Sequence, residues 1–104
     1  MRPDKLLSLL GLATKAGKVC SGEFMCEKSI KSGRAQLLII SDDASDNTGK
    51  KFSDMCTFYG VKFYTYGDSE ILGHAIGKAF RKVIGIEDPG FAESIGKLIE
   101  EKVR

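Results

Sequence analysis

The feature of this sequence that most limits its fold is the run QLLIIS at residues 36–41, which carries four apolar residues in succession. A strand with one face in water alternates apolar and polar side chains, whereas a strand that is apolar at every position is covered on both faces. Segments with helical periodicity stand on both sides of this run in the sequence. We therefore expect residues 36–41 to form a central parallel strand between two layers of helices.

The rest of the chain alternates helix and strand patterns that end at glycines or polar residues. We expect five helices: residues 4–16, residues 22–32, a third capped at 45–47 and ended by Gly60, residues 69–76, and a last one capped by Asp88. We expect strands at 61–66 and 82–87, and either a short strand or an extended segment at 19–21. The predicted fold class is α/β, a three-layer α/β/α sandwich with a small mixed, mostly parallel sheet, formed as one domain over residues 1–104.

Composition excludes several classes of protein. The hydrophobic fraction of 42% and the charged fraction of 29% are typical of globular proteins. The three cysteines are odd in number and lack a Cys-x-x-Cys spacing, which indicates reduced core thiols in a cytoplasmic protein. With one histidine, the chain offers no metal-ligand pair, P-loop or dinucleotide fingerprint. We expect no metal, no cofactor, no catalytic residue and no membrane contact, and we expect a monomer.

Positive charge concentrates in the first third of the chain. Residues 1–36 hold seven Lys or Arg against three acids, whereas residues 37–76 hold three Lys against six acids. A one-sided basic face suits a ligand with a phosphate backbone, although a solvated helix face gives the same count.

The segment 21–34 is the first candidate binding surface. In a helix at ~100° per residue, Phe24, Lys28 and Lys31 lie on one side, next to a turn made possible by Gly22. Amides at a helix amino end favour phosphate, and a base can stack on an exposed ring. The alternative is that Phe24 packs as a staple against a neighbouring segment and the lysines only keep the protein soluble.

Two further segments could carry chemistry. In GKAFRK at 77–82 an aromatic ring is flanked by cations, which suits base stacking with phosphate contacts; the alternative is a core Phe80 at a strand entrance. The acidic group after the central strand could hold Mg²⁺ in a small enzyme, or it could cap the next helix. That group consists of Asp42, Asp43, Asp46 and Asn47.

Several stretches in order resemble one known family across nearly the whole chain. They are Gly22-x5-Lys28-x4-Gly33-x-Ala35-x-Leu37-x-Ile39-Ile40, the helix around Cys56, and Leu72-Gly73-x-Ala75-x-Gly77. In this order they resemble the kink-turn-binding ribosomal proteins of the L-seven-Ae type, especially the small bacterial members made of one domain. The resemblance implies a non-catalytic RNA-binding protein that grips a sharply bent duplex. Its partners would be a kink-turn or related ribosomal RNA element and ribosomal proteins, on the ribosome or in RNA processing.

The resemblance also implies roles for particular positions. Gly22 would permit close backbone approach, Lys28 would contact bases or phosphates, and the loop at 78–81 would pack on extruded nucleotides, with a rim contact at 47–48. Together with the charge pattern, it gives fourteen candidate RNA-binding residues: Lys18, Gly22, Glu23, Phe24, Met25, Lys28, Lys31, Arg34, Asn47, Thr48, Lys78, Ala79, Phe80 and Arg81.

One departure concerns guanine recognition. Typical members place an Asn-Glu pair where this chain has Phe24 and Met25, and Glu23 lies two positions too early for that Glu in an ungapped alignment. Either Glu23 substitutes for it through a local shift, or guanine readout is weaker. Losing a bidentate contact costs ~1 to 3 kcal/mol of base discrimination, so shape and phosphate contacts would dominate. The alternative function is a protein-interaction module of a ribosomal or RNA-processing assembly, with Phe24, Phe80 or Tyr66 as anchors.

Overall fold

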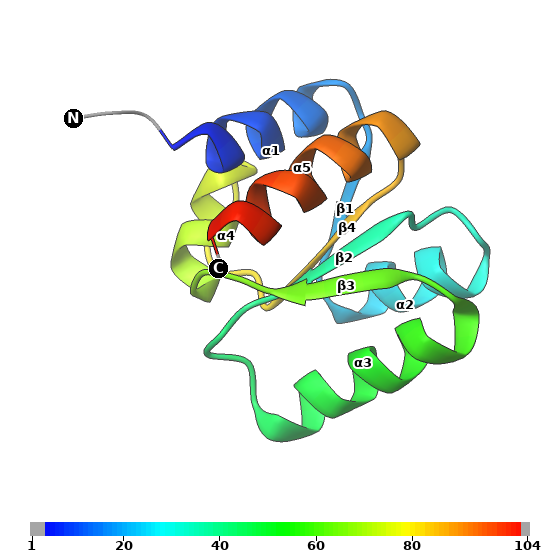
Figure 1. The fold of residues 1–104 in the computed structure, drawn as a ribbon. Helices are drawn as coiled ribbons and strands as arrows, with labels where there is room; N and C mark the ends of the chain where they lie inside the picture. Colours follow the sequence, from blue (N-terminus) through cyan, green and yellow to red (C-terminus); the bar gives the residue numbers. More distant parts are fainter. Residues whose placement is uncertain (1–3, 103–104) are drawn as a thin grey trace.

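The computed structural model of the protein describes residues 4–102. The outermost residues of the predicted domain, including Arg2 of the basic segment, lie outside this range. The elements follow one another as α1 (Lys5–Lys15), β1 (Val19–Ser21), α2 (Glu23–Lys31), β2 (Leu37–Ile40), α3 (Asp46–Tyr59), β3 (Lys62–Thr65), α4 (Ser69–Ala75), β4 (Val83–Ile86) and α5 (Pro89–Lys102) (Figure 1). Each predicted helix and strand is present, and residues 19–21 form a strand. None of the helices within 4–102 is long and apolar enough to cross a bilayer.

The four strands form one sheet in the order β1-β4-β2-β3. Strands β2 and β3 are parallel, while β4 is antiparallel to both β1 and β2. The α/β class is confirmed, but the prediction of a mostly parallel sheet is wrong, because only one strand pair is parallel. Burial of β2 on both faces reflects the helices that cover it, and this cover does not fix the direction of a neighbouring strand. The short helix α4 returns the chain into β4 at the end of the sheet where β3 stops.

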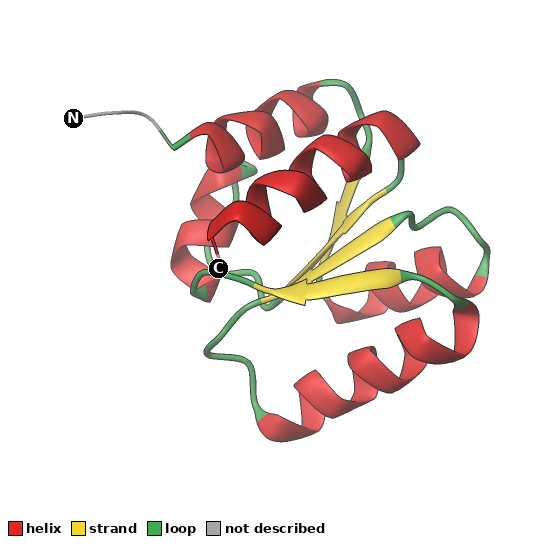
Figure 2. Ribbon diagram, viewed as in Figure 1, coloured by secondary structure: helices red, strands yellow, loops and turns green. Residues whose placement is uncertain are grey.

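The helices cover both faces of the sheet, as Figure 2 shows: α1, α4 and α5 lie on one face, and α2 and α3 lie on the other. Alternate residues of β2 supply the two cores, since successive side chains of a strand point to opposite faces. Leu37 and Ile39 pack with the first layer of helices, and Leu38 and Ile40 pack with the second. The sheet therefore separates two apolar cores and holds the loops at its two ends in fixed positions.

The strand directions define two ends of the sheet. Strands β1, β2 and β3 stop, and β4 starts, at what we call the Gly22 end, where the Gly22 amide donates to the Val83 carbonyl at 3.0 Å. At the opposite end, which we call the Glu87 end, the Glu87 amide donates to the Lys18 carbonyl at 2.7 Å. The loops that follow β1, β2 and β3 and the loop that precedes β4 all meet at the Gly22 end.

Candidate nucleic-acid interface

The turn at Gly22 leads β1 directly into α2. Gly22 has a φ of 87°, a value that a residue with a Cβ rarely adopts. It is the N-cap of α2 but has no side chain that could accept from the first helical amides. Amides of the first turn lack helical partners and form the positive end of the helix dipole. The turn therefore leaves the amino end of α2 available to an anion.

The loop at 78–81 lies beside this turn. The Lys78 amide donates to the Gly73 carbonyl at 2.8 Å, and Arg81 Nε donates to the Ser21 hydroxyl at 3.1 Å. A Cβ at Gly73 would lie 1.6 Å from the Ala79 carbonyl oxygen. Only glycine at position 73 lets α4 and this loop approach so closely. Arg81, a candidate RNA contact, thus also tethers the loop to the residue before Gly22.

The start of α3 forms a third side of the same region. The Thr48 hydroxyl donates to Glu23 Oε2 at 3.4 Å, and the Thr48 amide donates to the Ser45 hydroxyl at 3.1 Å. Asn47 is exposed next to this contact. The predicted rim at 47–48 therefore adjoins the first residue of α2.

Two aromatic rings of this region are open to solvent. Phe24 is 77% exposed and Phe80 is 61% exposed, so Phe24 is not a packed staple and Phe80 is not a core residue. Met25, at 44%, is exposed beside Phe24. Tyr66 differs, because it is half-buried and its hydroxyl donates to Asp4 Oδ2 at 3.4 Å. Phe24 and Phe80 are therefore the rings available for stacking.

The lysines of the region differ in how far acids neutralise them. Lys28 and Lys78 are exposed, and no carboxylate of residues 4–102 forms an ion pair with either. Lys31 Nζ lies 2.9 Å from Glu27, which also pairs with Lys51 at 3.0 Å. The hydrogen bond from Lys31 lowers the pKa of the Glu27 carboxyl. Positive charge without a partner is therefore found at Lys28 and Lys78.

The structure separates three predicted residues from the rest. Lys18 lies at the Glu87 end, and Arg34 Nε is 3.6 Å from Glu87 Oε2, which also accepts a hydrogen bond from the buried Ser29 hydroxyl at 2.5 Å. Lys31 is the last residue of α2, about 12 Å along the helix axis from its first residue, Glu23. Lys28 lies between Lys31 and the Gly22 turn, in the last turn of α2. The remaining candidates come together near the Gly22 end: Gly22, Glu23, Phe24, Met25, Asn47, Thr48, Lys78, Ala79, Phe80 and Arg81.

The acidic side chains after β2 are not gathered into a cluster. Within residues 4–102 no three His, Cys, Asp or Glu side chains come close enough to hold one metal ion. Asp43 instead accepts hydrogen bonds from Ser69, and the Ser69 hydroxyl lowers the pKa of the Asp43 carboxyl to about 2. Sequence reasoning missed Ser69 and the packing role of Gly73. Gly73 belonged to the family-like motif, whereas no local pattern distinguished Ser69.

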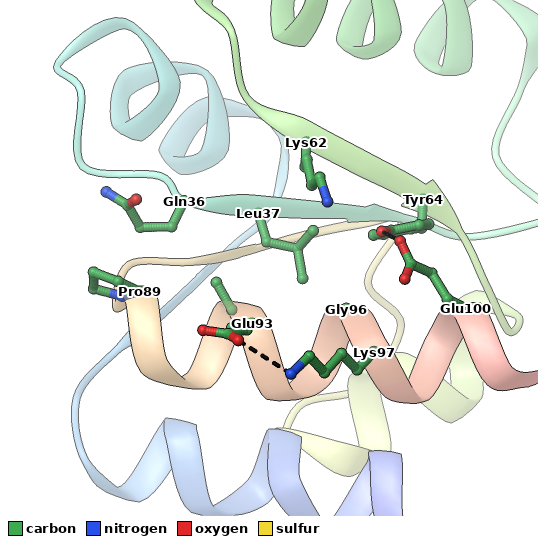
Figure 3. Close-up of a pocket in the computed structure, with 10 residues that line it drawn as sticks. Gln36, Leu37, Lys62, Tyr64, Pro89, Glu93, Gly96, Lys97 and Glu100 are labelled. Carbon is green, nitrogen blue, oxygen red and sulfur yellow. Dashed lines mark hydrogen bonds and ion pairs between the residues drawn. The ribbon is translucent and has the colours of Figure 1, made fainter.

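A pocket of about 390 Å³ lies between α5 and the strands β2 and β3, away from this region (Figure 3). Two of its four charged side chains form an ion pair with each other. Lys97 lies 3.1 Å from Glu93, and the Tyr64 hydroxyl donates to Glu100. None of the fourteen candidate residues lines this pocket, so we do not assign the predicted binding to it.

Comparison with known proteins places this geometry in a family. Residues 4–95 match the model of the ribosomal protein L7Ae/L30e/S12e/Gadd45 family. RNA-binding protein YlxQ of Bacillus subtilis (strain 168) is 42% identical over 92 residues, which cover 88% of this chain and 92% of that protein. RNA-binding protein YlxQ of Enterococcus faecium is 41% identical over 98 residues, 93% of each chain.

A solved structure agrees with these sequence matches. The structure of a protein with unknown function from Bacillus halodurans C superimposes with a TM-score of 0.91 at 41% identity and covers 94% of this chain and 99% of its own. The resemblance to the L-seven-Ae type is therefore confirmed over most of the chain. This chain belongs to the ribosomal protein L7Ae/L30e/S12e/Gadd45 family, a family of non-enzymatic proteins.

Proposed function

We propose that this chain is an RNA-binding protein whose Gly22 end holds a sharply bent RNA duplex of the kink-turn type. The observation that carries the proposal is the presence of three features around one glycine turn and along the helix that follows it. These are an uncapped helix amino end, two exposed rings, and two lysines without an acidic partner in residues 4–102. The YlxQ relatives, at 41–42% identity, are named as RNA-binding proteins, which supports the same conclusion.

Each feature suits one part of a bent RNA. Helix amides and lysines attract phosphates, and phosphates crowd together where two helical arms bend. Bases that leave the stack at a bend can pack on aromatic faces. Phe24 and Met25 offer guanine edges no hydrogen-bonding group, so RNA shape and stacking would provide the selectivity. We expect the protein to act as a monomer in the cytoplasm, with residues 1–104 forming one RNA-binding domain. If its RNA is ribosomal, ribosomal proteins would be its neighbours.

Chemical-shift mapping of the full chain with a kink-turn RNA tests this placement. We expect the largest amide shifts at Gly22, Phe24 and Lys78, and small shifts at Lys18 and Glu87. If the shifts instead centre on the Glu87 end, or if the RNA causes none, the proposed interface is wrong.

The second candidate function is a protein-interaction module, which would use the same exposed rings of Phe24 and Phe80 as anchors. Titration with ribosomal proteins in the presence and absence of the RNA separates the two. A protein that shifts the Gly22-end amides while the RNA does not would favour the module.

A further inference from the structure

Asp43 lies in the loop between β2 and α3, at the Gly22 end. Its Oδ1 accepts from the Ser69 amide at 3.0 Å, and its Oδ2 accepts from the Ser69 hydroxyl at 2.7 Å. Lys82 adds to the contact, since its Nζ lies 3.7 Å from Oδ2 and donates to the Asp43 carbonyl at 3.2 Å. One residue thereby connects the loop after β2, the start of α4 and the residue before β4.

Ser69 transmits this restraint to the loop at 78–81. Ser69 is only 2% exposed, and its carbonyl accepts from the Arg81 amide at 2.9 Å. One helical turn later, the Gly73 carbonyl accepts from the Lys78 amide at 2.8 Å. Helix α4 therefore holds both ends of this loop, and Asp43 holds the first residue of α4.

Arg81 extends the connection to the Gly22 turn. Its Nη1 donates to the Phe80 carbonyl at 2.8 Å, while its Nε reaches the Ser21 hydroxyl. The backbone beside the exposed Phe80 ring is thus fixed relative to the turn that precedes α2.

The same loop after β2 positions the rim of the site. Ser45, two residues after Asp43, caps α3 through the Thr48 amide, and Thr48 reaches Glu23 at the start of α2. Asp43 therefore lies between the two halves of the proposed interface, the loop at 78–81 and the amino end of α3.

We infer that Asp43 and Ser69 are positioning residues that hold these two halves at a fixed separation around the Gly22 turn, without contacting RNA themselves. The inference rests on the proposed function. Without the Asp43 carboxylate, the Ser69 amide and hydroxyl lose their acceptor and the loop at 78–81 gains freedom. RNA binding must then order that loop, which weakens affinity.

The sign of the effect distinguishes positioning from electrostatics. Removing an exposed carboxylate beside an RNA site strengthens binding, because it removes repulsion of phosphates. Asp42 is an exposed neighbour in the same loop, and its carboxylate has no hydrogen-bond or ion-pair partner among residues 4–102. Asp42→Ala and Asp43→Ala therefore change net charge equally, but only Asp43→Ala breaks the connection to Ser69.

The experiment compares these two variants in the full chain. The affinity for a kink-turn RNA is measured over a range of salt, and amide hydrogen exchange is followed at Arg81. We expect Asp43→Ala to raise Kd about tenfold with an unchanged salt slope and to speed exchange at Arg81. We expect Asp42→Ala to leave exchange unchanged and Kd equal or lower. Ser69→Ala keeps every charge, and we expect it to raise Kd as well. This variant replaces Asp43→Ala in the experiment if Asp43→Ala does not fold.

Three results would overturn the inference. Equal Kd values for the two aspartate variants would show that the connection to Ser69 does not matter for binding. Weaker binding by Asp43→Ala with normal exchange at Arg81 would show that Asp43 does not act through the loop. If the wild-type chain binds no RNA, the proposed function fails, and unchanged exchange at Arg81 in Asp43→Ala would then separately disprove the connection.

Discussion

Phe24 is the residue whose surroundings decide how this chain would recognise an unstacked base. It follows the Gly22 turn by two positions and is 77% exposed, so its ring is free to meet a ligand. An aromatic face stacks on any base, whereas a polar side chain at this position would select among base edges. Under the proposed function, Phe24 would favour binding of a bent or unstacked RNA over recognition of a particular base sequence.

Phe24→Ala should weaken binding to a kink-turn RNA by ~1 to 3 kcal/mol, the usual value of one stacked base. Phe58→Ala is a matched control, because Phe58 is 82% exposed but lies near the carboxyl end of α3, at the far end of that helix from Thr48. Calorimetric titration measures the RNA affinity of each variant. Equal losses for the two variants would show that Phe24 acts only as general apolar surface.

Lys28→Ala should reduce the slope of log K against log salt by about one unit, because one phosphate contact is lost. Lys97→Ala removes the same charge from α5, where Lys97 pairs with Glu93, and should leave the slope unchanged. Binding isotherms at several salt concentrations provide the slopes. A slope for Lys28→Ala that equals the wild-type value would mean that Lys28 does not touch phosphate.

At the scale of elements, α4 is the helix that positions one side of the proposed interface, although it carries none of the fourteen predicted contacts. It has seven residues, and the carbonyls of its first and fifth residues, Ser69 and Gly73, accept hydrogen bonds from the Arg81 and Lys78 amides of the loop at 78–81. Its packing against that loop has no room for a side chain at position 73. The short helix α4 therefore helps to fix the position of the loop that carries the exposed Phe80 ring.

Gly73→Ala should displace the loop at 78–81, because the new Cβ would lie 1.6 Å from the Ala79 carbonyl oxygen. Such overpacking typically costs ~1 to 3 kcal/mol of stability, and RNA affinity should fall as well. Gly49→Ala is the control for stability: no atom lies within 4 Å of its added Cβ in α3, so the unfolding free energy should rise by about 0.5 to 1 kcal/mol. Urea unfolding measures the free energy of unfolding of both variants. An unchanged value for Gly73→Ala would contradict the observed packing.

The positions of the elements could be predicted because apolar periodicity and glycine stops are local signals. The run at 36–41 gave a central strand, and the residues from Asp88 onward gave the last helix with its cap. Strand direction could not be predicted in this way. It depends on which end of the sheet α4 returns to, and this is a property of tertiary packing.

At the scale of the whole molecule, the sheet sorts the basic residues of the first third of the chain between two ends. Gly22 and Lys18 are close in sequence, yet the three-residue strand β1 places them at opposite ends. The candidate residues near the Gly22 end could be predicted from the glycine turn and the family-like motifs. The separation of Lys18 and Arg34 could not, because it follows from the pairing of β1 and β2 with β4.

Acid should weaken the whole fold partly through Asp43. The folded-state pKa of this carboxyl is about 2, below its ordinary value of 3.8, so its contribution to stability is fully present above pH ~4. That contribution is lost as the pH falls from ~4 through ~2. We expect the free energy of unfolding of Asp43→Ala to vary less over this range than that of Asp42→Ala. Thermal unfolding at a series of pH values measures this dependence. Identical pH profiles for the two variants would contradict the stabilising role of the Asp43 carboxylate.

The most direct test of the central claim is calorimetric titration of the full chain with a kink-turn RNA and with a straight duplex of equal length and charge, in the same salt. Because the proposed interface combines phosphate contacts with stacking on unstacked bases, we predict at least about tenfold tighter binding to the bent RNA. Equal affinity for the two RNAs would contradict the account.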